Sequence, residues 1–219
     1  MSYFQRHLDP GSRLGEILFG LIMVLTVTLT AGLTADSGRA GVRQLLVAAV
    51  GCNLAWGFID AVMYVMDCMT ERSARARLFR KVQNAADRAD ALAVIRREVE
   101  PQLQYLEGET HREAVYAAIL EEASDVTPVM TTRITREDVH GAIACFWLVV
   151  LSCLPAAVPF LVFSNPTRAL RVSNFLLIAM LFVVGQKWAH YINASRLTTG
   201  LALVAIGLCL VGVAVLLGG

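Results

Sequence analysis

Charged residues are scarce in this sequence. Asp, Glu, Lys and Arg make up 17% of its 219 residues, while 56% are hydrophobic. The mean hydropathy is +0.58. So little charge argues against an ordinary soluble domain and favours an integral membrane protein. The formal net charge of +1 gives no strong field, so we expect no nucleic-acid partner.

Cysteine pairs and lysine are also nearly absent. None of the five cysteines forms a Cys-x-x-Cys motif, which argues against a zinc site or a disulfide framework. We interpret the cysteines as small apolar helix residues. No cleavable signal peptide is expected, because the first apolar run is too long. Lysine occurs only at Lys81 and Lys187, and this preference for arginine, with abundant alanine, favours a bacterial source.

Five apolar runs are long enough to cross a bilayer, which requires about 20 residues. They cover residues 17–35, 44–66, 141–163, 172–191 and 197–217. Backbone groups cannot stay unpaired in lipid, so we predict an all-α integral membrane protein with five transmembrane helices. The third run contains Pro155 and Pro159. Gly20, Gly200 and Gly207 indicate close helix packing.

A charged segment separates the second and third runs. Residues 70–138 hold eleven of the nineteen basic residues and thirteen of the eighteen acidic ones. Apolar residues recur there every three or four positions, which predicts a helical insert. We expect a first helix over 71–94, whose continuation Pro101 interrupts. We expect a second helix from Glu109 to about Ala123. Thr135 and Asp138 resemble a capping signal for the next helix.

The predicted organisation is therefore an N-terminal segment at 1–13, two spans within 14–69, the insert at 70–138 and three spans within 139–219. With five spans, the N-terminus, the insert and the loop after the fourth span share one side. That side carries fifteen Lys and Arg residues, and the other side carries four. The positive-inside rule predicts a cytoplasmic N-terminus and a cytosolic insert, in a bacterial inner membrane.

The second run contains three polar residues at intervals of seven, Asn53, Asp60 and Asp67. Seven residues are nearly two helical turns, so the three share one face. Ionisable groups inside a span are costly and usually functional. Asp60 lies within the span and is the leading candidate. Asp67 is a cytoplasmic gate or a mere helix end, and Asn53 either lines a pathway or joins helices.

A cation site can be assembled from these groups and their neighbours. Glu16 opens the first span, with Met23 two turns later, and Met63 lies one turn from Asp60. Carboxylate oxygens with thioether sulfur suit Fe²⁺ or Mn²⁺ better than Mg²⁺ or Ca²⁺. Plainer interpretations stay open, because methionines pack well and a first-turn Glu favours the helix dipole.

Several segments resemble the vacuolar iron transporter family. LPAAVPFLVF (154–163) resembles its proline-rich third span, residues 170–219 resemble its last two spans, and LDPGSRLGEILFGLIMVLT (8–26) looks like a bacterial branch. The resemblance implies a homodimeric carrier that exports or sequesters Fe²⁺ or Mn²⁺ in exchange for protons. It implies a pathway lined by the first two spans at the dimer interface, and no bound cofactor or enzymatic activity.

The resemblance also implies site residues. Glu16 matches the acidic residue that opens the family's first span. In the second span, Asn53 and Ala61 stand where the family has Glu and Met, so Asp60 and Met63 are expected to supply the carboxylate and the sulfur. Acidic residues of the insert, with Glu109 and Glu113 as i,i+4 neighbours, form either a metal-gathering site or a solvated helix face.

Two other classes of function remain as alternatives. The first is a non-transporting membrane module whose insert binds a partner. The second is an intramembrane aspartyl hydrolase, which needs two carboxylates from facing helices in contact. Asp60 and Asp67 lie about 10 Å apart on one helix, so they do not meet that condition.

Overall fold

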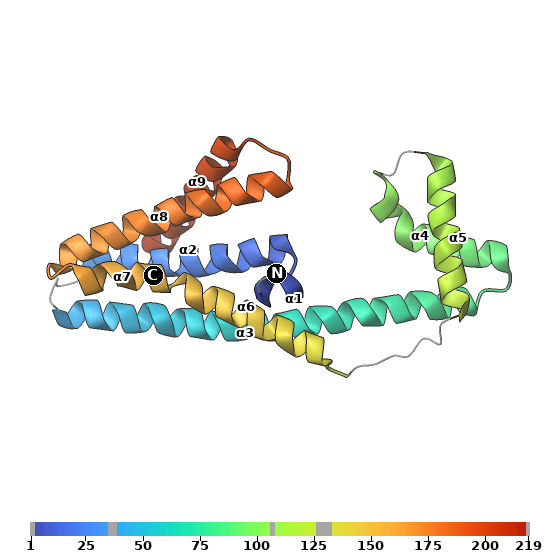
Figure 1. The fold of residues 1–219 in the computed structure, drawn as a ribbon, viewed down its shortest axis with the longest axis horizontal. Helices are drawn as coiled ribbons and strands as arrows, with labels where there is room; N and C mark the ends of the chain where they lie inside the picture. The colour runs from blue at the N-terminus through green and yellow to red at the C-terminus, as the bar shows by residue number, and fades with distance from the viewer. Residues whose placement is uncertain (1–2, 35–38, 106–107, 126–132, 218–219) are drawn as a thin grey trace. The chain divides into compact units, whose positions relative to one another are not determined.

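The computed structural model describes residues 3–34, 39–105, 108–125 and 133–217, and every regular element within them is a helix (Figure 1). The all-α prediction is confirmed for these residues. In chain order the helices are α1 (Tyr3–His7), α2 (Pro10–Thr34), α3 (Arg39–Gln83), α4 (Arg88–Leu103), α5 (Glu109–Asp125), α6 (Arg136–Ser152), α7 (Leu154–Val162), α8 (Pro166–Tyr191) and α9 (Arg196–Leu216).

The chain divides into two compact units. The first comprises Met1–Val65 and Arg136–Gly219, and the second is Met66–Thr135. The second unit corresponds to the predicted insert, for which we expected the bounds 70–138. Five stretches among the described residues are long and apolar enough to cross a membrane: Pro10–Thr30, Gln44–Gln83, Arg136–Val162, Pro166–Tyr191 and Arg196–Ala214. They correspond to the five predicted runs.

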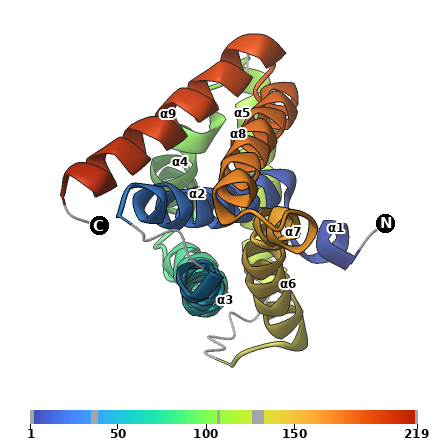
Figure 2. The ribbon, with the colours of Figure 1, turned by 90° about the vertical axis from the view of Figure 1, so that its left-hand side faces the viewer.

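In the first unit, α2 is the central helix. It packs against α6, α8 and α9, and Figure 2 shows it end-on among them. Its Leu21 and Leu25 are fully buried in one apolar cluster with Leu177 and Leu181 of α8 and Val211 of α9. Small residues let the helices approach closely, since lipid removes the hydrophobic drive for association. Gly200 illustrates this, because an added methyl would lie 2.6 Å from the Phe182 ring.

The third span is broken between α6 and α7. Pro155 has no N–H and cannot continue the hydrogen-bond ladder of α6, which ends at Ser152. Nearby side chains bond the backbone there: Ser152 Oγ donates to the Val149 carbonyl at 2.6 Å, and Ser173 Oγ of α8 donates to the Ala156 carbonyl at 2.8 Å. Hydroxyls thus stabilise an irregular backbone at membrane depth.

In the second unit, the predicted helix over 71–94 is wrong. Helix α3 ends at Gln83, a turn follows, and α4 begins at Arg88 with Asp87 as its N-cap, accepting from the Asp90 amide at 2.8 Å. Pro101 lies inside the last turn of α4 and does not interrupt it. The second predicted helix is confirmed as α5.

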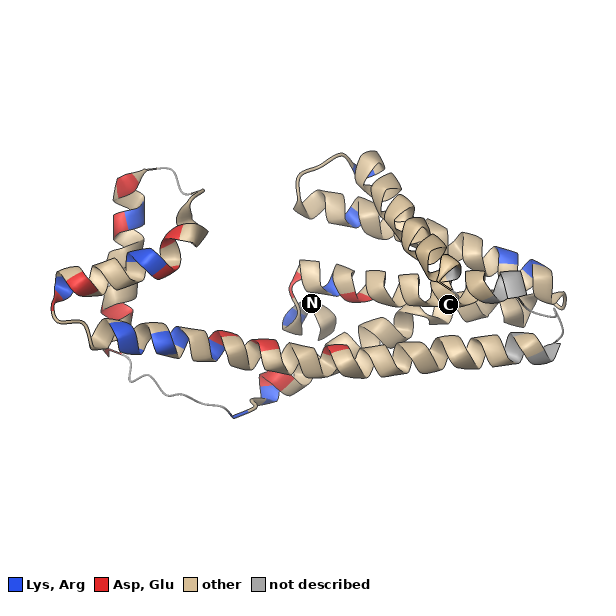
Figure 3. Cartoon of the chain, turned by 180° about the vertical axis from the view of Figure 1, so that it is seen from behind, with Lys and Arg blue, Asp and Glu red and all other residues tan. Residues whose placement is uncertain are grey.

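One apolar core joins the helices of this unit. Val82, Ile95, Tyr116 and Leu120 are buried in it, one or two from each helix. Charged residues are frequent along α4 and α5, as the blue and red segments of the ribbon show in Figure 3, and most of them are exposed. The two helices are joined by ion pairs, which fits a solvent-exposed helical hairpin.

Candidate functional site: a carboxyl pair between facing helices

One face of α3 carries a stripe of small and polar residues, namely Asn53, Gly57, Asp60 and Tyr64. Their spacing of four, three and four places them on the same side of the helix. Asn53 is fully buried and Asp60 is half-buried. By contrast, Phe58 and Met63 on other faces are 66% and 52% exposed. Of the predicted stripe, Asn53 and Asp60 therefore face protein in the first unit, whereas Asp67 is exposed.

Two glycines let α2 and α6 reach this stripe. A methyl group added to Gly20 of α2 would lie 1.8 Å from Ser152 Oγ and 3.1 Å from Asn53 Oδ1. A methyl group on Gly141 of α6 would lie 2.2 Å from the Tyr64 ring. The distances to Ser152 Oγ and to the Tyr64 ring are too short for a real side chain, so three helices converge on the stripe only because these positions are glycine.

A pair of carboxyl groups lies along this stripe. Glu16 of α2 and Asp60 of α3 come within hydrogen-bonding reach of each other, and the Cys145 thiol of α6 lies within reach of Glu16. Each of the three helices thus contributes one ionisable side chain. Because two carboxyl groups bond to each other only through a shared proton, the pair can hold a proton between α2 and α3.

Several oxygens of the stripe are buried without a hydrogen-bond partner among the described residues. These atoms are Glu16 Oε2, Asp60 Oδ2 and Asn53 Oδ1. The amide nitrogen of Asn53 does have a partner, since it donates to the Ala49 carbonyl at 3.1 Å. Buried acceptors are normally satisfied, and leaving one unpaired is costly. The stripe can therefore accept a cation or a proton donor.

Helix α1 lies at one end of the stripe. Tyr64 donates from its hydroxyl to the His7 carbonyl at 3.2 Å, and the Tyr3 hydroxyl donates to the His140 carbonyl at 3.1 Å. The rings of His7 and His140 stack with centroids 5.2 Å apart. These contacts fix α1 to α3 and α6, one turn beyond Asp60 on the α3 stripe.

The other residues predicted for a metal site are not brought to this pair. Met23 is half-buried on α2, and Met63 is largely exposed. Asp67 is exposed and belongs to the second unit, as do Glu109, which is exposed, and Glu113, which pairs with an arginine of α4 at 2.5 Å. No group of three or more His, Cys, Asp or Glu suited to a metal ion occurs in the described part of the chain.

Sequence reasoning missed Cys145 as a neighbour of Glu16. Cys145 had been interpreted as an apolar helix residue, yet it follows Gly141 by one turn and precedes Ser152 by two. That spacing marks a small and polar face on α6, and it was the available signal.

Five apolar stretches and buried polar groups between them define the class: this is a multi-pass membrane protein. No protein-family model matches the chain, and no curated protein matches it.

Proposed function

We propose that this protein carries a divalent cation, Fe²⁺ or Mn²⁺, across the membrane in exchange for protons, with Glu16 and Asp60 as its central site. One observation carries the proposal: two carboxyl groups from different helices meet inside the bundle, and each has an oxygen without a partner among the described residues. A cation that takes both carboxylates releases the proton they share. That exchange couples metal binding to proton release.

The chemistry of the donors fits this substrate class. Carboxylate and amide oxygens bind Mn²⁺ and Fe²⁺, and the Cys145 thiol adds a softer donor that Mg²⁺ and Ca²⁺ do not favour. The resemblance of the spans to the vacuolar iron transporter family supports the same function. It further suggests a divergent bacterial member, with an N-terminus in the cytoplasm, and a homodimer that buries the exposed apolar face of α3 around Met63.

Flux measurements in liposomes test the proposal. Wild-type protein is expected to take up Fe²⁺ or Mn²⁺ at a rate that depends on the pH gradient. Asp60→Asn should abolish uptake, because an amide cannot exchange a proton for a cation. Asp67→Asn is the matched control, since Asp67 is an exposed aspartate of the same helix, and it should retain uptake. Equal uptake by wild type and Asp60→Asn would remove Asp60 from the mechanism.

The carboxyl pair also favours a second candidate, an intramembrane hydrolase. Contact between Glu16 and Asp60 meets the requirement that Asp60 and Asp67 fail, namely two carboxyl groups on facing helices. Such an enzyme should cut a transmembrane peptide added to the proteoliposomes, with cleavage detected by mass spectrometry. Cleavage that Asp60→Asn abolishes, without metal flux in the wild type, would favour the hydrolase. The absence of both metal flux and peptide cleavage would favour a partner-binding module.

A further inference from the structure

The carboxyl oxygens that have no partner among the described residues lie out of reach of solvent. Glu16 Oε2 and Asp60 Oδ2 are buried atoms, and Cys145, which lies within reach of Glu16, is only 1% exposed. One turn from Glu16, a methyl group on Gly20 would lie 1.8 Å from Ser152 Oγ, so the helices already touch on that side. Water or a cation can therefore reach these oxygens only if part of the bundle moves.

The segment of residues 3–8, which comprises α1 and Leu8, lies beside α6 at the other end of the stripe (Figure 1). Leu8 is 5% exposed and shares one apolar cluster with Cys145 of α6. On α3, the Tyr64 hydroxyl, one turn from Asp60, donates to a backbone carbonyl of α1 at 3.2 Å. The segment therefore contacts a close neighbour of each carboxyl group.

Few contacts hold this segment in place. Of the side chains that the structure describes in residues 3–8, only that of Leu8 is buried. The Tyr3 hydroxyl makes an exposed hydrogen bond, which it donates to the His140 carbonyl at 3.1 Å. Leu8 and Asp9 are the only residues between α1 and α2. A short segment with one buried apolar side chain and exposed hydrogen bonds opens locally at a lower free energy than a well-packed bundle.

We propose that residues 3–8 form a lid over the carboxyl pair, with Leu8 as the side chain that holds the lid shut. Opening withdraws Leu8 from Cys145 and breaks the hydrogen bonds of Tyr3 and Tyr64, which uncovers the pair from this end. A transporter exposes its site to one side of the membrane at a time, and the lid supplies one of the two barriers that this requires. This purpose rests on the proposed function, whereas the opening itself can be measured without transport.

Alkylation of the native cysteines measures the opening. The full chain in a neutral detergent is treated with N-ethylmaleimide, and peptide mass spectrometry follows the rate at each cysteine. Cys145 should react slowly in the wild type, because it is only 1% exposed, and at least about tenfold faster in Leu8→Ala. Cys153 is the internal reference, since it is 3% exposed but belongs to the apolar cluster of α2, α8 and α9. Lid opening should leave the Cys153 rate unchanged, whereas unfolding would expose both cysteines.

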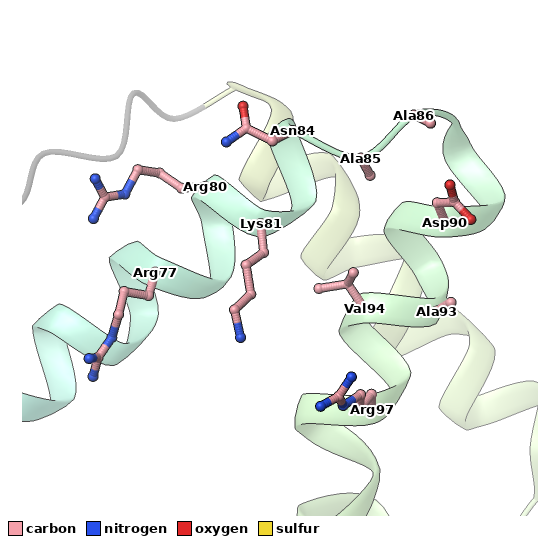
Figure 4. A pocket seen from close by; sticks show the side chains of 10 residues that line it. All are labelled: Arg77, Arg80, Lys81, Asn84, Ala85, Ala86, Asp90, Ala93, Val94 and Arg97. Atoms are coloured by element: carbon pink, nitrogen blue, oxygen red, sulfur yellow. The ribbon is translucent and has the colours of Figure 1, made fainter.

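Matched variants separate the lid from a general loosening. Leu181→Ala makes the same truncation at a fully buried leucine of α8, outside the lid's cluster, and should not favour Cys145 over Cys153. Val94→Ala shortens a side chain of the insert that points toward α3 (Figure 4), and it should leave both rates within about twofold. Tyr3→Phe removes a hydroxyl that bonds α6 and keeps the ring, so it should speed the reaction of Cys145 by only about threefold.

A cross-link gives the opposite test, because the rings of His7 and His140 stack with centroids 5.2 Å apart. The variant H7C/H140C, joined by a short bifunctional methanethiosulfonate, should react at Cys145 more slowly than the wild type. Reductant should reverse this protection. Full cation flux through the cross-linked protein would contradict the role of the lid in transport.

Circular dichroism checks that each variant keeps its helix content, and Tyr3→Phe provides a second test should Leu8→Ala misfold. A folded Leu8→Ala protein that reacts no faster at Cys145, or equally faster at Cys153, would overturn the lid. Faster reaction of Cys145 alone, without divalent-cation flux in liposomes, would support the lid and contradict the proposed function.

Discussion

The two units of this protein differ in how exposed their charged side chains are and in whether those side chains are paired. In the helical insert, acidic and basic residues are numerous and exposed, and three ion pairs join its helices. In the membrane bundle, Glu16 and Asp60 meet at the stripe, and one buried oxygen of each has no partner in the part of the chain that the structure describes. Exposed pairs contribute little energy and form readily in water. Unpaired buried carboxyls are costly, and a fold that keeps them usually uses them.

The sequence suggested two groups of acidic residues as candidates for a cation site, one in the insert and one in the bundle. This comparison explains why the second is the better candidate. Glu113 in the insert already has a partner, and its side chain is 40% exposed. Glu16 faces another carboxyl group, so a bound cation would offset the repulsion between the two carboxylates. A solvated helix face is therefore the better interpretation of Glu109 and Glu113, and the bundle is the better place for a cation.

The largest expected effect comes from making one chemical change in both units. Glu16→Gln should lower cation flux in liposomes by about 100-fold, equivalent to about 2.7 kcal/mol, because it removes one carboxylate of the proposed cation and proton site. Glu113→Gln is the matched change in the insert and should alter flux by less than about twofold, since it breaks only an exposed ion pair. Similar losses in both variants would contradict the contrast between the units.

Packing at the stripe gives the second prediction. Gly20→Ala should destabilise the bundle by about 1–3 kcal/mol, because the new methyl overlaps Ser152 and the Val149 carbonyl. Gly15→Ala on the same helix meets no neighbouring atom and should be neutral or slightly stabilising through helix propensity. Thermal unfolding of both variants in detergent, followed by tryptophan fluorescence, measures the difference. A Gly20→Ala protein as stable as Gly15→Ala would show that the helices do not meet there.

Much of the bundle could be predicted because lipid imposes simple rules. Apolar length located the spans, and the cost of a buried charge singled out Asp60. Contacts between spans were harder, since no periodicity in one helix says which helix it faces. Glu16 was identified as a candidate, but its contact with Asp60 required the fold. Cys145 was missed because a single thiol in an apolar run is typical of a packing residue, and only its spacing from Gly141 and Ser152 marked a polar face.

The prediction for the insert was wrong for a different reason, because it missed a local break between two helices. Ala85 and Ala86 continue the apolar repeat across the turn between α3 and α4, so periodicity predicted one helix where there are two. A signal was present, because Asp87 followed three residues later by Asp90 resembles an N-terminal capping pattern. Pro101 was overweighted, since it is tolerated in the last turn of α4 before the helix ends at Leu103.

A smaller effect is expected at the start of α2, where a charged group is exposed yet well bonded. Asp9 accepts from the amides of Gly11 and Ser12 at 2.8 and 3.1 Å, and the Ser12 hydroxyl also donates to it. Asp9→Ala should cost about 0.5–2 kcal/mol through loss of this cap. Hydrogen exchange at residues 11–14 should rise, whereas Asp9→Asn, which keeps an acceptor oxygen, should change it less.

The same cap predicts a pH dependence. The hydrogen bond from the Ser12 side chain lowers the pKa of Asp9 below its ordinary value of 3.8. A lowered pKa means that the folded state favours the carboxylate, so the stabilisation is complete above pH 3.8 and is lost as the pH falls through the folded pKa. Exchange at residues 11–14 should therefore rise in acid in the wild type and depend less on pH in Asp9→Ala.

The smallest expected effect lies in the insert, at the hydrogen bond from the Tyr116 hydroxyl to Glu100. This bond lowers the pKa of Glu100 and raises the pKa of Tyr116. Tyr116→Phe keeps the buried ring, so amide exchange in α4 and α5 should rise only roughly threefold near neutral pH. The contribution of Glu100 exists above its ordinary pKa of 4.5 and disappears as the pH falls through its lowered folded value. In Tyr116→Phe that folded pKa moves back toward 4.5, so exchange in α4 and α5 should depend less on pH in acid than in the wild type. Identical acid profiles for the two proteins would mean that the bond to Tyr116 does not hold Glu100 in its charged form.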